Sequence, residues 1–316
     1  MRVIRNLTRL RAPLARCVLT LGNFDGVHLG HQAIVRSVVD RARAASGCGV
    51  VLTFEPHPMA VLAPERAPAI IQPVRDRLAL LGELGVDVTV VQRFTHAFAA
   101  LEPEAFVRDF LCRYLDLVYV IVGYNLNFGR RCAGSGETLR ALGAQRGFGV
   151  EVVGPVTVGE ERVSSTRLRR LIEAGDMPGA RWLLGRPYAL RGRVVGGDRR
   201  GRDLGFPTAN LKLPPGLLLP RDGVYAVTVE IDGHSYPGLL NVGVRPTFGG
   251  RRRMIETHVL DFAGNLYGRW LVVRLVERLR DEQKFAGPEA LRAAIAADVA
   301  DARVVLARGA LTSRGG

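Results

Sequence analysis

From the N-terminus to about residue 185, the chain alternates between two hydrophobic patterns. Short runs rich in β-branched residues predict buried strands, and the stretches between them carry apolar residues at helical spacing. The predicted strands are residues 18–21, 50–54, 86–92 and 119–123, and the predicted helices are 32–45, 75–84, 102–115 and 164 to about 174. This alternation favours an α/β domain with a parallel sheet wrapped by helices.

Beyond about residue 185 the pattern changes. Residues 223–231 and 270–277 place an apolar side chain at every second position. Alternating strands with Gly/Pro turns and no intervening helices predict an antiparallel sheet or small β-barrel. A last helix is expected from residue 288 to about 306, with one apolar stripe. We therefore expect two domains, residues 1–185 and 186–316.

The most distinctive segment follows the first predicted strand and reads G-N-F-D-G-V-H-L-G-H, from Gly22 to His31. His28 and His31 flank Gly30 and can project from one face of the first turn of a helix. Helix N-termini favour phosphate, because their N–H groups are unpaired and the helix dipole is positive there. Two histidine donors at this place could hold a polyphosphate. The alternative is a pair of ordinary histidines at a helix start.

Three further segments follow predicted strands and suit nucleotide chemistry. The first supplies an amide, and the second supplies an aromatic side chain that can line a planar ligand. The third supplies hydroxyls and a cation at a helix start, an arrangement suited to phosphates. The residues are Asn125, Phe54 and the run Ser164, Ser165, Thr166 and Arg167. Taken alone, the S-S-T run is also typical of an ordinary helix cap.

A second candidate site lies in the C-terminal part, which has no G-x-x-x-x-G-K-[ST] motif. The segment from Gly196 to Asn210 contains glycines whose backbone N–H groups can close on an anion. Thr208 and Asn210 lie two apart in an extended stretch, so their oxygens face the same way and suit Mg²⁺ shared with ATP phosphates. By pattern alone, this could also be an arginine-flanked loop.

Composition restricts the function classes. The net charge is +14, but all basic residues except Lys212 and Lys284 are arginine, a bias that affects the whole chain. We expect attraction for anionic nucleotides, and no nucleic-acid partner. No apolar run could span a bilayer, no signal peptide is recognisable, and the four cysteines lack C-x-x-C spacing. We expect a cytoplasmic enzyme with no membrane partner; the sequence leaves the oligomeric state open.

The histidine motif resembles the G-x-F-D-G-x-H-x-G-H element of nucleotidyltransferases, and most of all the adenylyltransferase half of bacterial bifunctional riboflavin kinase/FAD synthetases. The resemblance implies a Rossmann-like sheet, ATP and FMN as substrates, and no covalent intermediate. His28 and His31 would stabilise the transition state. The residues implied to bind ATP are Gly22, Phe24, Asp25, Gly30, Asn125, Ser164, Ser165, Thr166 and Arg167. Phe54, Phe106 and Phe128 would contact the flavin. Asn125 stands where many relatives carry Asp, so only a hydrogen-bonding role carries over.

The C-terminal segment G-F-P-T-A-N resembles the riboflavin kinase signature, as do N-V-G-V-R-P-T-F from Asn241 and E-T-H-V-L-D-F from Glu256. The resemblance implies that riboflavin and ATP bind here, that Thr208 and Asn210 hold Mg²⁺, and that Glu256 is the general base. Glu256 would share a face with His258, Leu260 and Phe262. The remaining implied kinase residues are Gly196, Gly201, Gly205, Pro207 and Arg280.

Two other functions stay open on the residues alone. One is a nucleotidyltransferase for another phosphate ester, with an accessory barrel. The other is a regulator that binds flavins or RNA without turnover. Because the double-histidine motif is paired with G-F-P-T-A-N and E-T-H-V-L-D-F in one chain, we predict a bifunctional enzyme that makes FMN and then FAD.

Overall fold

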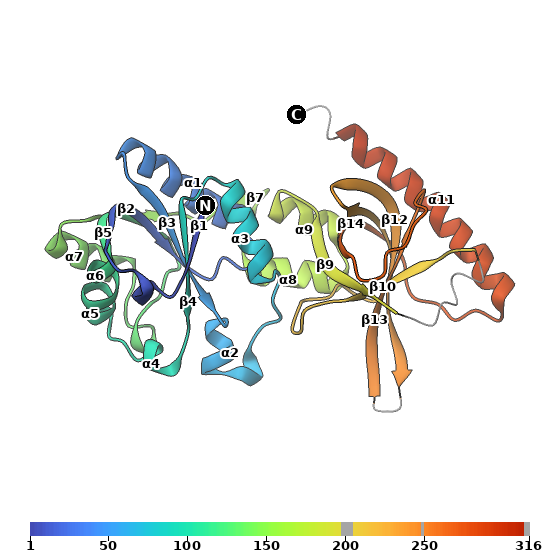
Figure 1. Cartoon of the computed structure of the whole chain (residues 1–316), viewed down its shortest axis with the longest axis horizontal. Coiled ribbons are helices and arrows are strands. Elements are labelled where there is room, and N and C mark those ends of the chain that lie inside the picture. Colours follow the sequence, from blue (N-terminus) through green and yellow to red (C-terminus); the bar gives the residue numbers. More distant parts are fainter. Residues whose placement is uncertain (197–204, 248–249, 313–316) are drawn as a thin grey trace. The chain divides into compact units, whose positions relative to one another are not determined.

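A parallel sheet and a closed barrel form the two parts of the chain (Figure 1). The computed structural model describes residues 1–196, 205–247 and 250–312, and the side chains of 245–252 and 309–312 are left undescribed within these ranges. The residues cluster into two units, Met1–Ser165 and Thr166–Gly316. The predicted division into two domains near residue 185 stays a prediction.

The first unit contains a six-stranded sheet in the order β1-β4-β3-β2-β5-β6, and every neighbouring pair is parallel. The strands are β1 (Arg2–Arg5), β2 (Leu14–Leu21), β3 (Cys48–Glu55), β4 (Val88–Arg93), β5 (Leu115–Gly123) and β6 (Gly149–Val153). A small hairpin, β7 (Thr157–Val158) and β8 (Glu161–Arg162), precedes the end of the unit. The predicted parallel α/β architecture is confirmed.

Helices connect these strands, as parallel pairing requires. They are α1 (Leu29–Ala44), α2 (Pro58–Leu62), α3 (Val74–Glu83), α4 (His96–Ala99), α5 (Pro103–Ala105), α6 (Cys112–Tyr114) and α7 (Gly136–Arg146). Short helical turns accompany them: η1 (Leu7–Arg9), η2 (Pro64–Arg66), η3 (Phe106–Leu111) and η4 (Arg130–Cys132). The helix expected over residues 102–115 is divided into α5, η3 and α6, and η3 is a π-helix.

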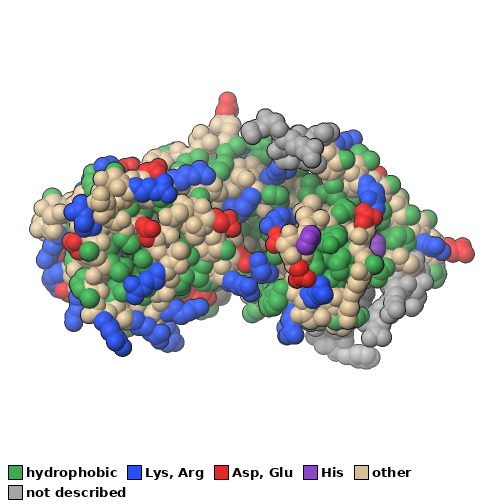
Figure 2. Space-filling view, turned by 45° about the horizontal axis from the view of Figure 1, so that its top comes forward, with side chains coloured by type: hydrophobic (Ala, Val, Ile, Leu, Met, Phe, Trp, Pro, Cys, Tyr) green, Lys and Arg blue, Asp and Glu red, His purple; other side chains and the backbone are tan. Residues whose placement is uncertain are grey.

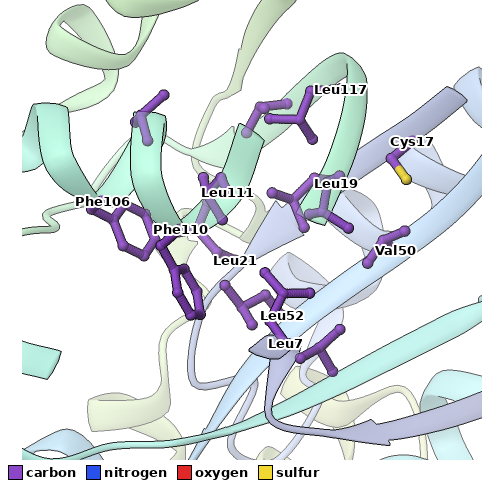
Figure 3. Close-up of a cluster of buried hydrophobic side chains, with 14 of the residues drawn as sticks. Leu7, Cys17, Leu19, Leu21, Val50, Leu52, Phe106, Phe110, Leu111 and Leu117 are labelled. Atoms are coloured by element: carbon purple, nitrogen blue, oxygen red, sulfur yellow. The ribbon is translucent and has the colours of Figure 1, made fainter. Parts of the chain in front are cut away.

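The largest apolar core of this unit lies on one side of the sheet (Figure 3). Leu19 of β2 and Leu52 of β3 point toward Phe110 and Leu111 of η3, and all four are buried. A separate cluster includes Phe24 of the loop after β2, Val35 of α1 and Leu81 of α3. These two clusters hold the central strands, so the loops that follow the strands start from fixed positions.

The second unit contains a closed antiparallel barrel in the order β10-β13-β12-β11-β14-β9. Its strands are β9 (Tyr188–Val195), β10 (Thr208–Lys212), β11 (Gly223–Ile231), β12 (His234–Thr247), β13 (Gly250–Val259) and β14 (Trp270–Arg280). The alternating apolar side chains of β11 fill the interior, since Tyr225, Val227 and Val229 have no exposed surface. The predicted barrel is confirmed.

Three helices complete the second unit: α8 (Ser165–Ala174), α9 (Met177–Leu184) and α11 (Pro288–Thr312). The predicted terminal helix is confirmed as α11, which packs on the outer face of the barrel. Its Ala302 is fully buried against Val224, Ala226 and Leu239. One stretch of the outer face is therefore covered by α11.

Candidate functional site

In the first unit, the candidate residues follow two neighbouring strands at the same edge of the sheet. β2 and β5 pair in parallel, with Leu19 opposite Val120. The chain places β3 and β4 on one side of β2, and β5 and β6 on the other, so the strand order reverses between β2 and β5. Ligands of open α/β sheets bind beyond the carboxyl ends of the strands at such a reversal.

His28 and His31 lie together at the start of α1. His28 is the N-cap residue, and its Nδ1 accepts a hydrogen bond from the backbone N–H of His31 at 3.2 Å. The two imidazole rings stack with their centroids 3.7 Å apart. Because Nδ1 accepts this bond, the ring proton of neutral His28 lies on Nε2, which can donate to an anionic oxygen.

Gly30 leaves the space that the ring of His28 occupies. A Cβ at position 30 would lie 3.2 Å from Cε1 and 3.3 Å from Nδ1 of His28. Contacts this short fall below the optimal separation of non-bonded carbon atoms. A side chain at position 30 would therefore displace the imidazole.

The loop between β2 and α1 has an uncommon backbone. Gly22 continues the sheet, since its N–H donates to the carbonyl of Leu52 at 3.0 Å. Phe24 and Val27 then have positive φ angles of 49° and 40°. This conformation is costly for a side chain, above all a β-branched one, and persists only where surrounding contacts impose it. The ring of Phe24 is buried and meets His31 edge-on, with centroids 5.2 Å apart.

Asp25 supplies part of that restraint. Its buried carboxylate accepts hydrogen bonds from the backbone N–H groups of Ile71 and Gln72, both at 3.0 Å. The backbone carbonyl of Asp25 accepts a hydrogen bond from the hydroxyl of Ser165 at 3.3 Å. Asp25 thus holds the loop in place through contacts with the protein, and it connects the loop to the predicted S-S-T segment.

The four residues of that segment divide between the two units. Ser164 and Ser165 are half-buried and close the first unit. Thr166 and Arg167 lie in the first turn of α8, in the second unit. Helix α8 begins at Ser165, so the expected helix start is confirmed.

Asn125 is exposed just beyond β5. Its Oδ1 lies above Gly123, where an added Cβ would be 3.2 Å from it. The N–H of Leu126 donates to the carbonyl of Gly123 at 3.0 Å, which turns the chain at the strand end. The amide therefore lies at the edge of the sheet where the histidine loop begins.

The three predicted flavin contacts belong to one aromatic cluster, but differ in exposure. Phe106 and Phe128 are buried, at 4% and 7% exposed, with ring centroids 5.5 Å apart. Phe54, at the end of β3, is partly exposed and meets Phe94 and Phe98 at centroid distances of 5.6 and 5.9 Å. Phe54 thus presents more surface to a ligand than the other two.

Two further residues contact this loop and were not predicted from the sequence, Thr53 and Arg77. Both are buried, and Arg77 donates to the Thr53 hydroxyl oxygen at 3.2 Å. An arginine inside a helical pattern is normally solvated, so only the burial in the folded structure reveals Arg77.

In the second unit, the candidate residues lie side by side in neighbouring strands. Asn210 of β10 pairs directly with Glu256 of β13, and Glu256 pairs directly with Asn241 of β12. Directly opposite residues of antiparallel strands point to the same face, with Cβ atoms about 5 Å apart. Their neighbours Ile255 and Thr257 are buried. The row therefore lies on the outer face of the barrel. No role was predicted for Asn241 from the sequence.

Thr208 begins β10 and pairs with His258 of β13, two positions along from the row. Nδ1 of His258 lies 2.8 Å from the carbonyl oxygen of Pro207, so Nδ1 carries a proton and donates it. Strand β13 ends at Val259, so the face expected to include Leu260 and Phe262 extends only to His258.

The glycines predicted to surround the kinase nucleotide fall partly outside the described residues. Gly196 and Gly205 are both exposed, and Gly205 has a φ of 85°, which glycine adopts readily. Gly201 lies outside the described residues, as does the stretch that joins these two positions.

The oxygens of the row fit a hard cation. Within the described part of the chain, Oδ1 of Asn210 is a buried oxygen with no hydrogen-bond partner. An orphaned buried acceptor is costly, and a bound cation or donor would satisfy it. No group of three or more His, Cys, Asp or Glu side chains suited to a metal occurs among the described residues. Neutral oxygens such as those of Asn210 and Thr208 suit Mg²⁺ that phosphates also bind.

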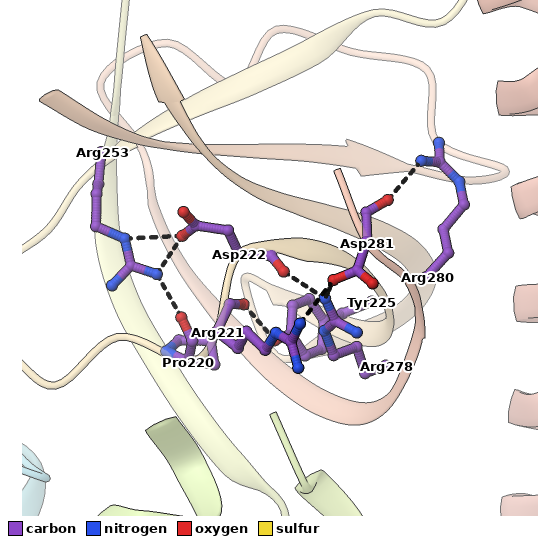
Figure 4. Close-up of polar contacts among 8 residues, drawn as sticks. All are labelled: Pro220, Arg221, Asp222, Tyr225, Arg253, Arg278, Arg280 and Asp281. Carbon is purple, nitrogen blue, oxygen red and sulfur yellow. Dashed lines mark hydrogen bonds and ion pairs between the residues drawn. The ribbon is translucent and has the colours of Figure 1, made fainter. Parts of the chain in front are cut away.

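Arg280 is held by an acidic residue of α11. It binds both carboxylate oxygens of Asp298 at 2.7 Å, and it donates to the backbone carbonyl of Asp281 at 2.9 Å. Figure 4 shows Arg280 at the edge of a network in which Arg253 and Arg278 bind Asp222 and Asp281. Arg280 therefore ties the end of β14 to α11.

Charged side chains are interspersed over the face shown in Figure 2, where blue, red and green patches alternate. The expectation that nucleic acid is not a partner stays a prediction. Within the described residues, no helix has the length and apolar character needed to cross a membrane.

Comparisons with known proteins assign both parts. A family model described as FAD synthetase matches residues 11–167, and one described as riboflavin kinase matches residues 184–306. A bifunctional riboflavin kinase/FMN adenylyltransferase of Pseudomonas fluorescens is 42% identical over 308 residues, covering 97% of this chain and 98% of that protein. Its Escherichia coli K12 counterpart is 40% identical over 305 residues, covering 96% and 97%.

A solved structure has the same fold over nearly the whole length. It is a Streptococcus pneumoniae protein described as a macrolide-efflux protein, with a TM-score of 0.86 and 32% identity, covering 96% of this chain and 99% of that one. That description belongs to the pneumococcal protein alone.

A parallel α/β sheet that matches FAD synthetases, followed by a barrel that matches riboflavin kinases, defines a class of transferases that use ATP. Within that class, the chain belongs to the family of bifunctional riboflavin kinase/FMN adenylyltransferases. It is an enzyme that phosphorylates riboflavin to FMN and then transfers an adenylyl group from ATP to FMN, giving FAD.

Proposed function

We propose that His28 and His31 donate hydrogen bonds to ATP phosphate oxygens during adenylyl transfer. A phosphate oxygen of FMN attacks the α-phosphorus, the bond to the β-phosphate breaks, and pyrophosphate leaves. Negative charge spreads over the phosphates in this step. Donors fixed before the reaction stabilise such charge at little reorganisation cost. The Nδ1 bond that leaves His28 Nε2 as its donor supports this role.

The remaining adenylyltransferase residues serve binding in this proposal. Ser164, Ser165, Thr166 and Arg167 hold the triphosphate, as consecutive residues that close one unit and open α8. Gly22, Phe24, Asp25 and Gly30 shape the loop that presents the two histidines. Asn125 donates a hydrogen bond to the nucleotide, and Phe54, Phe106 and Phe128 line the flavin side.

For the kinase reaction, Glu256 is the proposed general base. It removes the proton from the ribityl 5′-hydroxyl of riboflavin as that oxygen attacks the γ-phosphorus, and ADP leaves. Thr208 and Asn210 would hold Mg²⁺, which neutralises phosphate charge when bound. The observation that carries this proposal is the strand register that sets Asn210 directly opposite Glu256.

The flanking residues complete the kinase site. Gly196, Gly201, Gly205 and Pro207 form the nucleotide loop in this proposal. Arg280 acts on the site through its bidentate ion pair with Asp298, which fixes α11 against the end of β14. Riboflavin, FMN and ATP are the partners, nucleic acid and membranes are not, and we infer a cytoplasmic location.

A chromatographic time course of the purified protein with riboflavin, excess ATP and Mg²⁺ tests the proposal. We expect FMN to appear first and FAD afterwards. FMN without FAD would contradict the adenylyltransferase assignment, and the replacement of Asp by Asn at position 125 would be examined first. Unchanged riboflavin would contradict the kinase assignment.

A further inference from the structure

We infer that Arg77 of α3 is a positioning residue for adenylyl transfer: it holds the loop that presents His28 and His31. This inference rests on the function proposed for the two histidines. Arg77 is 3% exposed, so it acts through the residues that it contacts inside the protein. Arg77 contacts the two side chains that hold the loop, Thr53 and Asp25, which we call its tethers.

The first tether is a hydroxyl. The side chain of Thr53, on β3, donates to the backbone carbonyl of Asn23 at 3.0 Å. A hydroxyl has one proton, and Thr53 gives it to Asn23, so its Oγ1 meets any further donor as an acceptor. That donor is Arg77, whose Nη1 donates to Oγ1 at 3.2 Å. The guanidinium thereby fixes the direction in which Thr53 donates.

The second tether is the Asp25 carboxylate. It is 2% exposed and is bound by two backbone N–H groups, which are neutral. A buried carboxylate needs an opposite charge, and Nη2 of Arg77 lies 4.0 Å from Oδ1 of Asp25. Burial lowers the pKa of the Arg77 guanidinium, and the nearby carboxylates of Asp25 and Glu55 oppose that shift. Arginine nevertheless keeps its charge in proteins.

The loop needs these tethers because its backbone is strained at Phe24 and Val27. A strained segment keeps its shape only where contacts over-determine it. His28 follows Val27 directly, so a relaxation of the loop moves the N-cap of α1 and the stacked imidazoles with it. Small displacements of catalytic groups lower turnover strongly.

Fold stability alone does not account for a cation here. Within the described residues, Nε of Arg77 is buried without a hydrogen-bond partner. A well-packed apolar side chain commonly stabilises a fold as much as a buried ion pair does. We therefore attribute the buried guanidinium, with its unfavourable desolvation free energy, to the need to maintain the geometry of this loop.

The test compares Arg77→Met with Arg77→Lys in the full-length enzyme, with FMN and ATP supplied for adenylyl transfer. We expect kcat to fall about tenfold or more in the Met variant and less than about threefold in the Lys variant, with KM for both substrates within about threefold. Riboflavin phosphorylation in the same samples should keep its wild-type rate, which controls for the amount of enzyme, and the melting temperature reports whether the first unit is folded.

A double-mutant cycle separates positioning from general destabilisation. If Arg77 acts through His28, adding Arg77→Met to a protein that already carries His28→Asn should lower kcat for adenylyl transfer by less than about threefold. An equal loss in both backgrounds would overturn the inference, as would a wild-type kcat for Arg77→Met. Should the Met variant fail to fold, the cycle is run with Arg77→Gln, which also removes the charge, and is read in the same way.

Ile4→Ala is the matched control for stability. Ile4 is a buried residue of the edge strand β1, three strands away from β2. A variant with a similar drop in melting temperature should retain adenylyl transfer; an equal loss of kcat would contradict a positioning role. If the wild-type enzyme makes no FAD, the proposed function fails. If it does and Arg77→Met does so equally well, only the inference about Arg77 fails.

Discussion

The first unit builds its site from loops that follow parallel strands, whereas the second builds its site from side chains within antiparallel strands. His28 and His31 are neighbours in sequence and stack on one helix turn. Asn210 and Glu256 are far apart in sequence, and the pairing of β10 with β13 brings them together. One site therefore depends on local backbone geometry and the other on strand register.

This difference implies different weaknesses. The histidine loop has a strained backbone and depends on the contacts that hold it. The barrel row depends on pairing, because a slip of one residue would turn Asn210 or Glu256 to the interior face. Changes at the histidines should leave the barrel row intact, and the reverse, since the histidines lie in the first unit and the row lies in the second.

The largest expected effect separates the two activities at the barrel. Glu256→Gln keeps the size of the side chain and removes the base, so we expect riboflavin phosphorylation to fall about 1,000-fold. Adenylyl transfer to supplied FMN should be unchanged. Separate initial-rate assays of the two reactions test this. A kinase rate within about tenfold of wild type would exclude Glu256 as the base.

The reciprocal change is His28→Ala. It removes a donor that faces the phosphates, and we expect adenylyl transfer to fall about 100-fold to 1,000-fold while FMN formation continues. The same pair of assays measures it. Loss of FMN formation as well would refute independent sites.

A smaller effect is expected from Gly30→Ala, which leaves every polar group in place. The new methyl group would meet the ring of His28, so we predict a loss of adenylyl transfer of about tenfold. Alanine favours helices by about 1 kcal/mol over glycine, so the melting temperature should not fall through helix propensity. A variant with full adenylyl transfer would show that the ring position does not limit the rate.

Asn210→Ala tests whether the two sites differ in how they bind Mg²⁺. Removal of this oxygen should raise the Mg²⁺ concentration for half-maximal kinase rate by about tenfold, a cost of about 1.4 kcal/mol. The Mg²⁺ dependence of adenylyl transfer in the same protein is the control, and it should not change. An unchanged kinase dependence would argue against Asn210 as a ligand.

The smallest effect concerns the cysteines, all of which lie in the first unit. Burial, with a further contribution from Cys48, raises the pKa of Cys17 to about 12. Only about one Cys17 in 10,000 is then thiolate at pH 8, and the thiolate is the reactive form. Iodoacetamide should label exposed Cys132 first and Cys17 last, as peptide mass spectrometry would show. Labelling of Cys17 in the folded protein at pH 8 would contradict this.

The same shift has a consequence for stability. Cys17 binds its proton more tightly when folded, so its contribution is complete below the unfolded pKa of 9.0 and is lost as the pH rises toward about 12.

The sequence predicted the architecture well where the pattern was strong. Strands β2 to β5 and helix α1 were found because their apolar residues repeat over whole elements. Strand β1 was missed because only Ile4 of its four residues is buried, and β6 because none of its residues is fully buried. Edge strands with few buried residues show only a weak hydrophobic pattern in the sequence.

The site was predictable to the extent that it is contiguous. The motif from Gly22 to His31 could be interpreted directly, and so could the spacing of Thr208 and Asn210. The pairing of Asn241 with Glu256 and the burial of Arg77 beneath Asp25 depend on tertiary structure, so no local pattern indicates them. The roles of these residues stay predictions.

Mixing two inactivated proteins tests the central claim of two independent sites most directly. His28→Ala with riboflavin, ATP and Mg²⁺ should stop at FMN, and Glu256→Gln should leave riboflavin unchanged. The mixture should make FAD, because FMN released by the first variant is adenylylated by the second. A mixture that makes no FAD, or a single variant that lacks both activities, would contradict the account.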